Sequence, residues 1–205
     1  MNTLRVWRIS LLSLLMLLGS ANLGFALGET GQTVTYKVLH DTTAGTLTTY
    51  THYSIVAQEP QGYWLQRTTS MRIDSDPLSI TQTLLDDYTH EPLRYIMHRP
   101  AKMNRPPRVV DLPLEEMGQE EILPTPITPT ASEPMSLRLD AGTFEVRKGG
   151  QDGLILWLSR EVPVLGVAKV EAPEWTMELV RITDNATDLL PRKPPQGGMI
   201  YLENE

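Results

Sequence analysis

The sequence predicts a mainly β protein built on one antiparallel sheet. Apolar residues recur at every second position along most of the chain, which is the periodicity of a strand with one buried face. Short turns rich in Gly, Pro and Asp join these alternating segments, as in antiparallel meanders. The chain has seven Tyr and four Trp but only two Phe, a composition that favours sheet surfaces over helix bundles. We therefore expect at most one or two short helices.

The N-terminus has the pattern of a secretory signal peptide. Arg5 and Arg8 precede an apolar stretch over 9–18, and Gly24-Phe25-Ala26 fits the small-x-small pattern of a signal peptidase site. A membrane-spanning helix needs about 20 apolar residues, so an uncleaved anchor is the less favoured alternative. We expect residues 1–26 to be the signal peptide and the mature chain to begin at Leu27, with Asn22 as a second candidate start.

Cysteine usage and charge narrow the function classes. The chain has no Cys, so neither a disulfide nor a lipid on cysteine can form, and we expect a periplasmic protein that is not a lipoprotein. Cleavage removes two of 18 basic and none of 25 acidic residues, which changes the net charge from −7 to −9. This acidic balance disfavours nucleic acid as a partner.

The first half of the mature chain predicts five successive strands. Their alternation extends over 33–40, 46–57, 63–73, 78–84 and 93–98, and each connection carries turn residues. A proline-rich region over 99–134 follows, where eight of the sixteen prolines lie. Proline lacks the N–H that a sheet ladder needs, so we expect a loop there, either a solvated connection or a flap. Within it, residues 111–122 could form a short helix that begins near Asp111.

The second half predicts five more strands, over 136–139, 143–147, 154–159, 167–171 and 175–182. The third and fourth of these are separated by REVPVLG, in which Pro163 removes a ladder donor and Gly166 permits unusual backbone angles. We expect a corner between two strands there, with Val164 partly exposed. Residues 27–183 then form a single β-domain, and 184–205 a C-terminal tail.

Several of these segments carry a family resemblance. The stretches AGTF at 141–144, WLS at 157–159, VP at 162–163, LGVAKVE at 165–171 and MEL at 177–179 resemble the C-terminal half of small exported bacterial β-proteins. These are similar in architecture to the LolA/LolB-type carriers of lipoproteins and to other lipid-binding half-barrels. The resemblance covers residues 135–182 by motif. It implies a strongly curved half-barrel sheet with an apolar concave face, and it transfers no site residue.

The candidate ligand-binding residues are the apolar side chains of that face. They are most simply core residues, but few helices are available to cover them, and an uncovered apolar face attracts a ligand or partner. The candidates are Leu47, Tyr53, Ile55, Leu65, Met71, Ile80, Leu84, Trp157, Met177 and Leu179.

Catalytic motifs are missing from the sequence. It contains no Gly-rich phosphate loop, no G-x-S-x-G elbow and no H-E-x-x-H pair. Asp86, Asp87, His90 and His98 could in principle hold a metal, but their composition is that of an ordinary turn, which we favour. We expect no catalytic residue, no metal and no cofactor.

Two function classes therefore remain ahead of an enzyme. One is a periplasmic binding protein that holds an acyl chain or a lipidated partner on the concave face. The alternative is an envelope structural or adaptor protein that docks another protein through a sheet edge or the proline-rich region. A cavity on the concave face would favour the first class, and a filled core the second.

Overall fold

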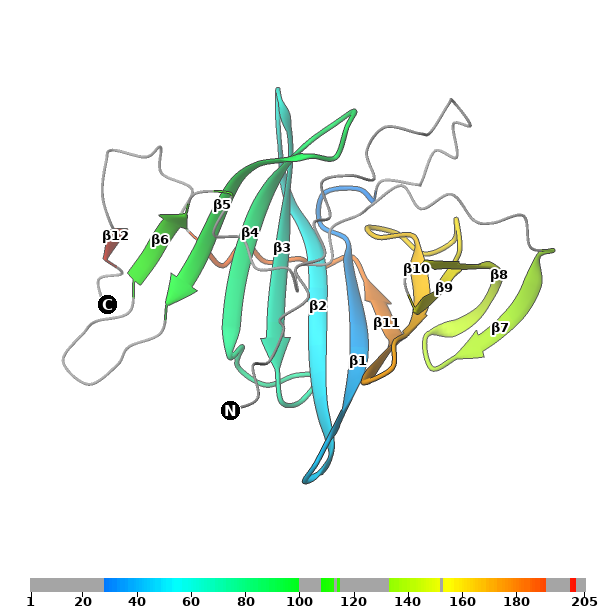
Figure 1. The fold of residues 1–205 in the computed structure, drawn as a ribbon. Coiled ribbons are helices and arrows are strands. Elements are labelled where there is room, and N and C mark those ends of the chain that lie inside the picture. The colour runs from blue at the N-terminus through cyan, green and yellow to red at the C-terminus, as the bar shows by residue number, and fades with distance from the viewer. Residues whose placement is uncertain are drawn as a thin grey trace, which may run out of the picture.

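A computed structural model describes residues 28–99, 108–112, 114, 133–151, 153–190 and 200–201. These residues form one open antiparallel sheet with the strand order β12-β6-β5-β4-β3-β2-β1-β11-β10-β9-β8-β7 (Figure 1). In this part of the chain there is no α-helix, and hence none suited to cross a membrane. The strands are β1 (Thr33–Thr42), β2 (Gly45–Glu59), β3 (Gly62–Ser70), β4 (Ser79–Asp86), β5 (Pro92–Arg99), β6 (Arg108–Leu112), β7 (Met135–Leu139), β8 (Gly142–Gln151), β9 (Leu154–Leu158), β10 (Val167–Glu171), β11 (Trp175–Thr183) and β12 (Ile200–Tyr201).

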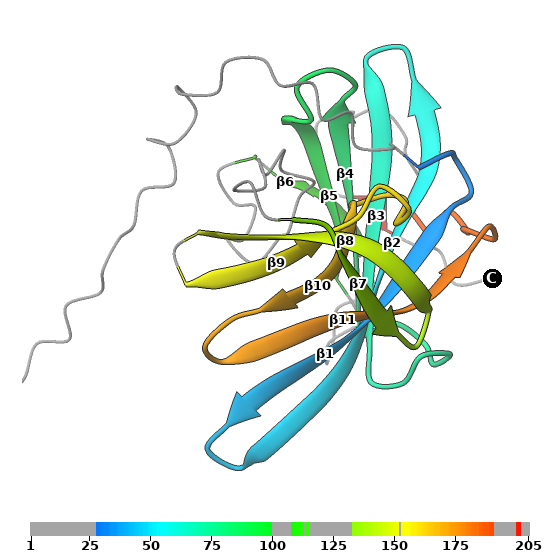
Figure 2. The same cartoon turned by 90° about the vertical axis from the view of Figure 1, so that its right-hand side faces the viewer.

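The mainly β fold is confirmed, and all ten predicted strands are present. The first strand lies in the middle of the sheet, between β2 and β11, so the two halves of the chain meet there. Strands β7 to β11 curl away from the plane of β1 to β5 (Figure 2). Since side chains of β3 and β9 share one core cluster although five places separate the strands, the sheet must curve around that cluster. We call the side it encloses the inner face.

The inner face carries the main hydrophobic core. Strand alternation directs Tyr36 and Tyr53 inward, where their rings meet edge to face at 6.0 Å between centroids. The Tyr36 hydroxyl donates a hydrogen bond of 2.7 Å to the Val167 carbonyl, so its polar end is satisfied inside the core. Burial raises the Tyr36 pKa well above its ordinary value. On the neighbouring strand β11, Leu179 lies opposite Tyr36 and Met177 lies opposite Val38, and all four side chains belong to this core. Each fully buried side chain of this kind contributes about 1.5–3 kcal/mol.

The corner predicted between β9 and β10 is confirmed. Ser159 N–H donates to the Gly166 carbonyl at 2.9 Å, which closes the loop over 159–166. Gly166 has a φ of 67°, the conformation for which glycine is suited. Val164, however, is only 3% exposed, so the expectation of partial exposure is wrong. The loop folds inward because Val162, Val164 and Leu165 all join the inner core.

The proline-rich region differs from the prediction in one place. Strand β6 lies inside 99–134 and pairs with β5, and Asp111 is a strand residue, not a helix cap. Its carboxylate accepts a hydrogen bond from Arg94 Nε at 2.9 Å. Prolines flank β6 in the sequence, but the five residues between them are free to pair near a sheet edge. Most of the predicted helix and flap lie outside the described residues, as does the signal peptide.

Candidate functional site

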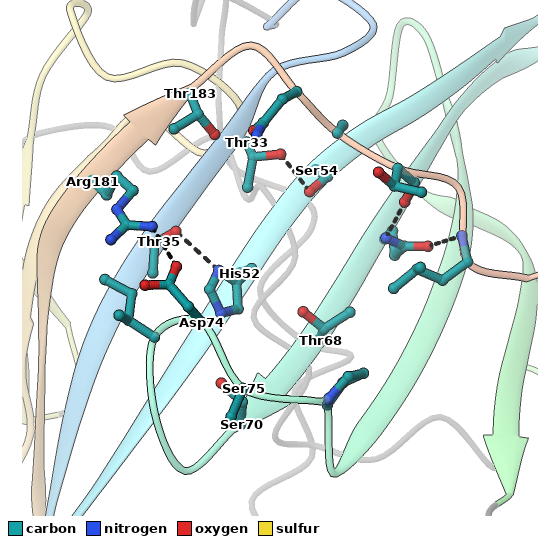
Figure 3. A pocket seen from close by; sticks show the side chains of 17 residues that line it. Thr33, Thr35, His52, Ser54, Thr68, Ser70, Asp74, Ser75, Arg181 and Thr183 are labelled. Carbon is teal, nitrogen blue, oxygen red and sulfur yellow. Dashed lines mark hydrogen bonds and ion pairs between the residues drawn. The ribbon is translucent and has the colours of Figure 1, made fainter.

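A polar cleft lies on the outer face of the sheet, opposite the core, with a volume of about 280 Å³. Its floor consists of outward-pointing side chains from four adjacent strands, β3, β2, β1 and β11 (Figure 3). Because strand alternation sends every second residue to this face, the apolar inner positions alternate with polar outer ones. The floor residues are Thr33, Thr35, His52, Ser54, Gln66, Thr68, Ser70, Arg181 and Thr183.

Two segments of chain form the walls of the cleft. The loop between β3 and β4, residues 71–78, contributes Ile73, Asp74, Ser75 and Pro77. The segment after β11, residues 184–190, contributes Asn185, Ala186, Thr187 and Leu189. We call these the β3–β4 loop and the C-terminal segment.

The β3–β4 loop reaches over β2 and β1 to β11. Arg181 Nη1 lies 2.7 Å from Asp74 Oδ1, an ion pair between the loop and the far side of the floor (Figure 3). The hydrogen bond with Arg181 lowers the pKa of Asp74 and raises that of Arg181. Inside the loop, Ser70 Oγ donates to the Arg72 carbonyl at 2.7 Å, and Arg72 N–H donates to Ser75 Oγ at 3.2 Å. The loop therefore has a defined shape and is tied down at its tip.

The C-terminal segment runs in the opposite direction, from β11 to β4. Gln66 holds its backbone at two points, because its Nε2 donates to the Thr187 carbonyl at 2.9 Å and its Oε1 accepts from Leu189 N–H at 2.9 Å. Gln82 Nε2 donates to Asp188 Oδ1 at 2.6 Å and to Gln66 Oε1 at 3.0 Å. Leu190 is buried in a second cluster with Trp64, Ile80, Leu84, Ile96 and Val109. The predicted tail thus begins with a structured wall of the cleft.

The floor side chains are paired across strands. Thr33 Oγ1 and Ser54 Oγ lie 2.8 Å apart, and Thr35 Oγ1 and His52 Nδ1 lie 2.9 Å apart. Burial and, to a smaller degree, the Arg181 charge lower the pKa of His52, which favours the neutral imidazole, while Asp74 opposes the shift. Of the hydroxyl residues in these pairs, Thr35 and Ser54 are at most 5% exposed, whereas Thr33 is half-buried and keeps part of its surface accessible.

The Thr35–His52 pair has the residue types of a nucleophile and a base, but the threonine is almost completely buried. The Asp74 carboxylate acts on His52 through its charge, while its hydrogen bond is to Arg181. Thr35 is 2% exposed in a central strand whose backbone donors face neighbouring strands.

The acidic stretch after β4 is a turn. Asp86 Oδ1 accepts hydrogen bonds of 2.8 Å from both Tyr88 N–H and Thr89 N–H, which lowers the Asp86 pKa. Tyr63 and His90 contact each other edge to face at 6.0 Å. No group of three or more His, Asp or Glu that could hold a metal occurs in the part of the chain that the structure describes.

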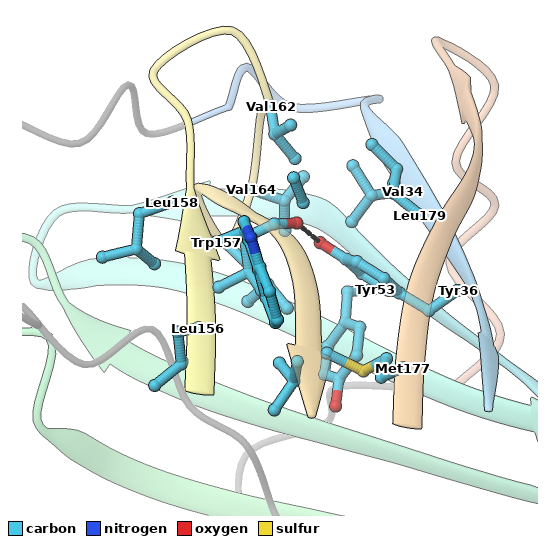
Figure 4. Packing of buried hydrophobic residues seen from close by; sticks show 14 of the residues in the cluster. Val34, Tyr36, Tyr53, Leu156, Trp157, Leu158, Val162, Val164, Met177 and Leu179 are labelled. Atoms are coloured by element: carbon cyan, nitrogen blue, oxygen red, sulfur yellow. Dashed lines mark hydrogen bonds between the residues drawn. The ribbon is translucent and has the colours of Figure 1, made fainter. Parts of the chain in front are cut away.

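The ten candidate apolar residues do not share one face. Six belong to the inner core: Tyr53, Ile55, Leu65, Trp157, Met177 and Leu179 (Figure 4, where Tyr53, Trp157, Met177 and Leu179 are labelled). Trp157 also has the ammonium groups of Lys148 and Lys169 at 5.2 and 5.3 Å from its ring centroid.

The other four candidates correct the prediction. Ile80 and Leu84 point to the outer side, because they pair with Thr68 and Trp64 in β3. Met71 is 48% exposed because β3 ends at Ser70, and Leu47 is 44% exposed near the β1–β2 turn. On the inner face, Tyr36, Tyr53, Met177 and Leu179 are at most 2% exposed, so these side chains fill the space that an acyl chain would need.

Sequence reasoning missed the cleft. The signal was present as a row of Thr, Ser, His and Gln at alternate positions of β1, β2 and β3. Such residues are typical of the solvent-facing side of any sheet. The walls that turn this row into a cleft come from 71–78 and 184–190, which the alternation pattern does not place.

Comparison with known proteins identifies no family. No family model matches the chain, and no curated protein matches it. Among solved structures, it is similar to a Bacteroides fragilis protein of inferred export that has a YmcC-like fold. The two are 12% identical, with a TM-score of 0.38, over 78% of this chain and 98% of that one. A TM-score this low carries no argument about fold or function, and no link to the LolA/LolB-type carriers is shown, so that resemblance stays a prediction.

Proposed function

We propose that the protein is an exported, non-enzymatic binding protein that holds a small polar ligand in the cleft on the outer face of its sheet. Export is supported by the N-terminal pattern of Arg5, Arg8 and the apolar stretch that follows. The binding role is supported by one observation above all: two segments from different parts of the chain enclose a hydroxyl-lined floor and are each fixed by side-chain hydrogen bonds. A site held in this way is organised before a ligand arrives, which lowers the entropy cost of binding.

The cleft is a better candidate than the inner face that the sequence suggested. An acyl chain on the inner face would have to displace packed tyrosine, methionine and leucine side chains, each with its own burial energy. The cleft requires no such displacement. An envelope adaptor role is not supported by a particular contact among the described residues.

The proposal is tested by following backbone amide shifts in isotope-labelled mature protein purified after export. The panel consists of maltose, N-acetylglucosamine, glutamate, glycine betaine, spermidine and palmitate. We expect at least one polar compound to shift amides of Thr35, His52, Ser54 and Thr68 in a saturable way. Thr68→Phe, which fills the floor, should abolish the effect, whereas Thr143→Phe on the exposed side of β8 should not.

Two results would overturn the proposal. One is a full titration in which no polar compound shifts the cleft amides. The other is saturable binding of palmitate with shifts at Tyr36, Tyr53 and Leu179, which would restore the acyl-carrier hypothesis. If Thr68→Phe does not fold, Asn185→Trp on the exposed wall serves as the blocking variant.

A further inference from the structure

The charge balance of the cleft restricts the ligand. Asp74 and Arg181 are the only carboxylate and guanidinium among its lining residues, and they neutralise each other at 2.7 Å. An anionic ligand would have to compete with Asp74 for Arg181, and a cationic ligand with Arg181 for Asp74. Because either competition costs an existing ion pair, the cleft is matched to a neutral molecule.

The hydrogen-bonding groups restrict it further. Eight lining residues carry a hydroxyl, which can both donate and accept hydrogen bonds. Four of them, Thr33, Ser75, Thr183 and Thr187, are half-buried or exposed, whereas Thr35, Ser54, Thr68 and Ser70 are at most 8% exposed. A ligand rich in hydroxyls has the same two-way capacity and can pair with them in several orientations. A peptide is a poor match, since the floor strands β1, β2, β3 and β11 already pair with strands on both sides and offer no free edge.

The walls add an apolar component. Ile73 and Pro77 belong to the β3–β4 loop, and Ala186 and Leu189 to the C-terminal segment. A sugar ring has the complementary character, with C–H faces and hydroxyl edges, so it can stand between the walls with one edge on the floor. The volume of about 280 Å³ lies just below the range of about 300–1,000 Å³ for small-molecule pockets, which suits one or two sugar residues.

We infer that the cleft binds a neutral pyranose sugar, either free or as the terminal residue of a glycan, recognised by the accessible Ser and Thr hydroxyls of its floor and walls. This inference rests on the proposed function, because it names the ligand class of the same site. The two sources share one chemistry, and the oligosaccharide arm of the experiment separates them.

The experiment compares neutral and charged sugars of nearly the same shape. Glucose, N-acetylglucosamine, glucuronate, glucosamine and tri-N-acetylchitotriose are titrated into labelled mature protein, and dissociation constants are taken from the cleft amides. We expect at least one neutral sugar to bind at least about tenfold more tightly than glucuronate and glucosamine. Binding of the trisaccharide without the monosaccharides would support the same inference and identify a glycan end as the source.

Three variants connect the binding to the named groups. Thr183→Val keeps the side-chain shape and removes one half-buried floor hydroxyl, so it should weaken sugar binding about three- to tenfold, while Thr143→Val on β8 should not. Asp74→Asn frees Arg181 and should strengthen glucuronate binding relative to the neutral sugar. Because Asp74 is well exposed, this variant should fold even if Thr183→Val does not.

The outcomes separate the inference from the proposed function. If glucuronate or glutamate saturates the cleft amides and no neutral sugar does, the sugar assignment is overturned and the cleft remains a binding site. If Asp74→Asn leaves the preference between charged and neutral sugars unchanged, the charge argument is wrong. If none of the sugars or the earlier polar panel shifts the cleft, the inference and the proposed function fail together.

Discussion

Val164 adopts a backbone conformation that valine rarely takes. Its φ is 68°, and Leu165 N–H donates to the Pro163 carbonyl at 2.8 Å, a hydrogen bond that spans one residue as in a γ-turn. A β-branched residue at positive φ costs of order 1–3 kcal/mol and persists only when its surroundings hold it there. Burial of the valine side chain in the inner core is what holds it, because an exposed valine could relax.

Substitution at Gly166 tests how strongly the corner depends on that glycine. Gly166→Val places a branched side chain at a φ of 67° in a buried position, so it carries a backbone cost of roughly 1–3 kcal/mol and an overpacking cost of similar size. Val164→Thr keeps the branched shape and adds only a buried hydroxyl, at roughly 1–3 kcal/mol. Urea unfolding should therefore show a larger loss for Gly166→Val. Equal losses would mean that Gly166 can relax into extended geometry.

The corner illustrates what single residues predict. Pro163 and Gly166 have strong backbone preferences of their own, so the sequence predicts the change of direction. Val164 has no preference for positive φ, and its conformation is imposed by the core beneath the loop. The sequence therefore could not predict either its burial or its backbone angle.

His52 should make stability depend on pH in the mildly acidic range. Since burial lowers its pKa in the folded state, the unfolded chain binds a proton more readily between that value and about 6.5. Stability is therefore present above about pH 6.5 and falls as the pH drops below it. The pKa of His98 is also lowered by burial and acts in the same direction.

The contribution of His52 is isolated by comparison of two proteins. His52→Asn retains a polar partner for Thr35 but does not titrate, so its free energy of unfolding should fall less steeply from pH 7 to pH 5 than that of the wild type. Urea unfolding at several pH values measures both slopes. Identical slopes would indicate that His52 titrates in the folded state as it does in the unfolded chain.

Among the structural elements, the C-terminal segment departs most from the sequence prediction. Its Asp, Asn and Thr residues show no alternation and predict a tail. The C-terminal segment is held in place instead by hydrogen bonds from Gln66 and Gln82, two side chains of β3 and β4, and by the burial of Leu190. Such contacts depend on residues more than a hundred positions away, which local pattern cannot show. The same limit applies to the inverted phase of β4, which is set by its pairing with β3.

Two adjacent leucines test whether this segment is anchored as described. Leu190 is 3% exposed in the second hydrophobic cluster, with Trp64 and Ile80, whereas Leu189 is 43% exposed at the cleft. Leu190→Ala should cost about 2–5 kcal/mol, and Leu189→Ala should stay within about 0.5–1 kcal/mol. Thermal unfolding of the two variants decides the matter, since a small loss at Leu190 would mean that the segment is not held by the cluster.

At the scale of the whole molecule, the sequence predicts the strands but not their order. Alternation depends only on residues close in sequence, so it predicts ten of the strands. The pairing of β1 with β11 joins residues 33–40 to residues 175–183, and no nearby turn indicates it. The cleft depends on this pairing, because Arg181 and Thr183 reach the floor only through it.

Export is the prediction that concerns the entire chain. Protein recovered from the cell envelope should begin at Leu27 or, less favoured, at Asn22, because signal peptidase cleaves after small residues. Intact-mass measurement and N-terminal sequencing establish the start. Recovery of Met1 on envelope protein would instead indicate an uncleaved anchor. Thermal stability should be indifferent to reductant, since the chain contains no cysteine.

The position of β1 between β2 and β11 also governs how the chain folds. Strands β1 to β5 follow one another and can pair as soon as they are synthesised, but one edge of β1 stays open until the last long strand exists. Closing so long a loop is slow, because its entropy cost comes before the contacts that offset it. During that interval β1 is an edge strand with Val34, Tyr36 and Val38 uncovered on one side, which can pair with another copy. Folding yield should therefore be decided by competition between β11 of the same chain and β1 of a neighbouring one.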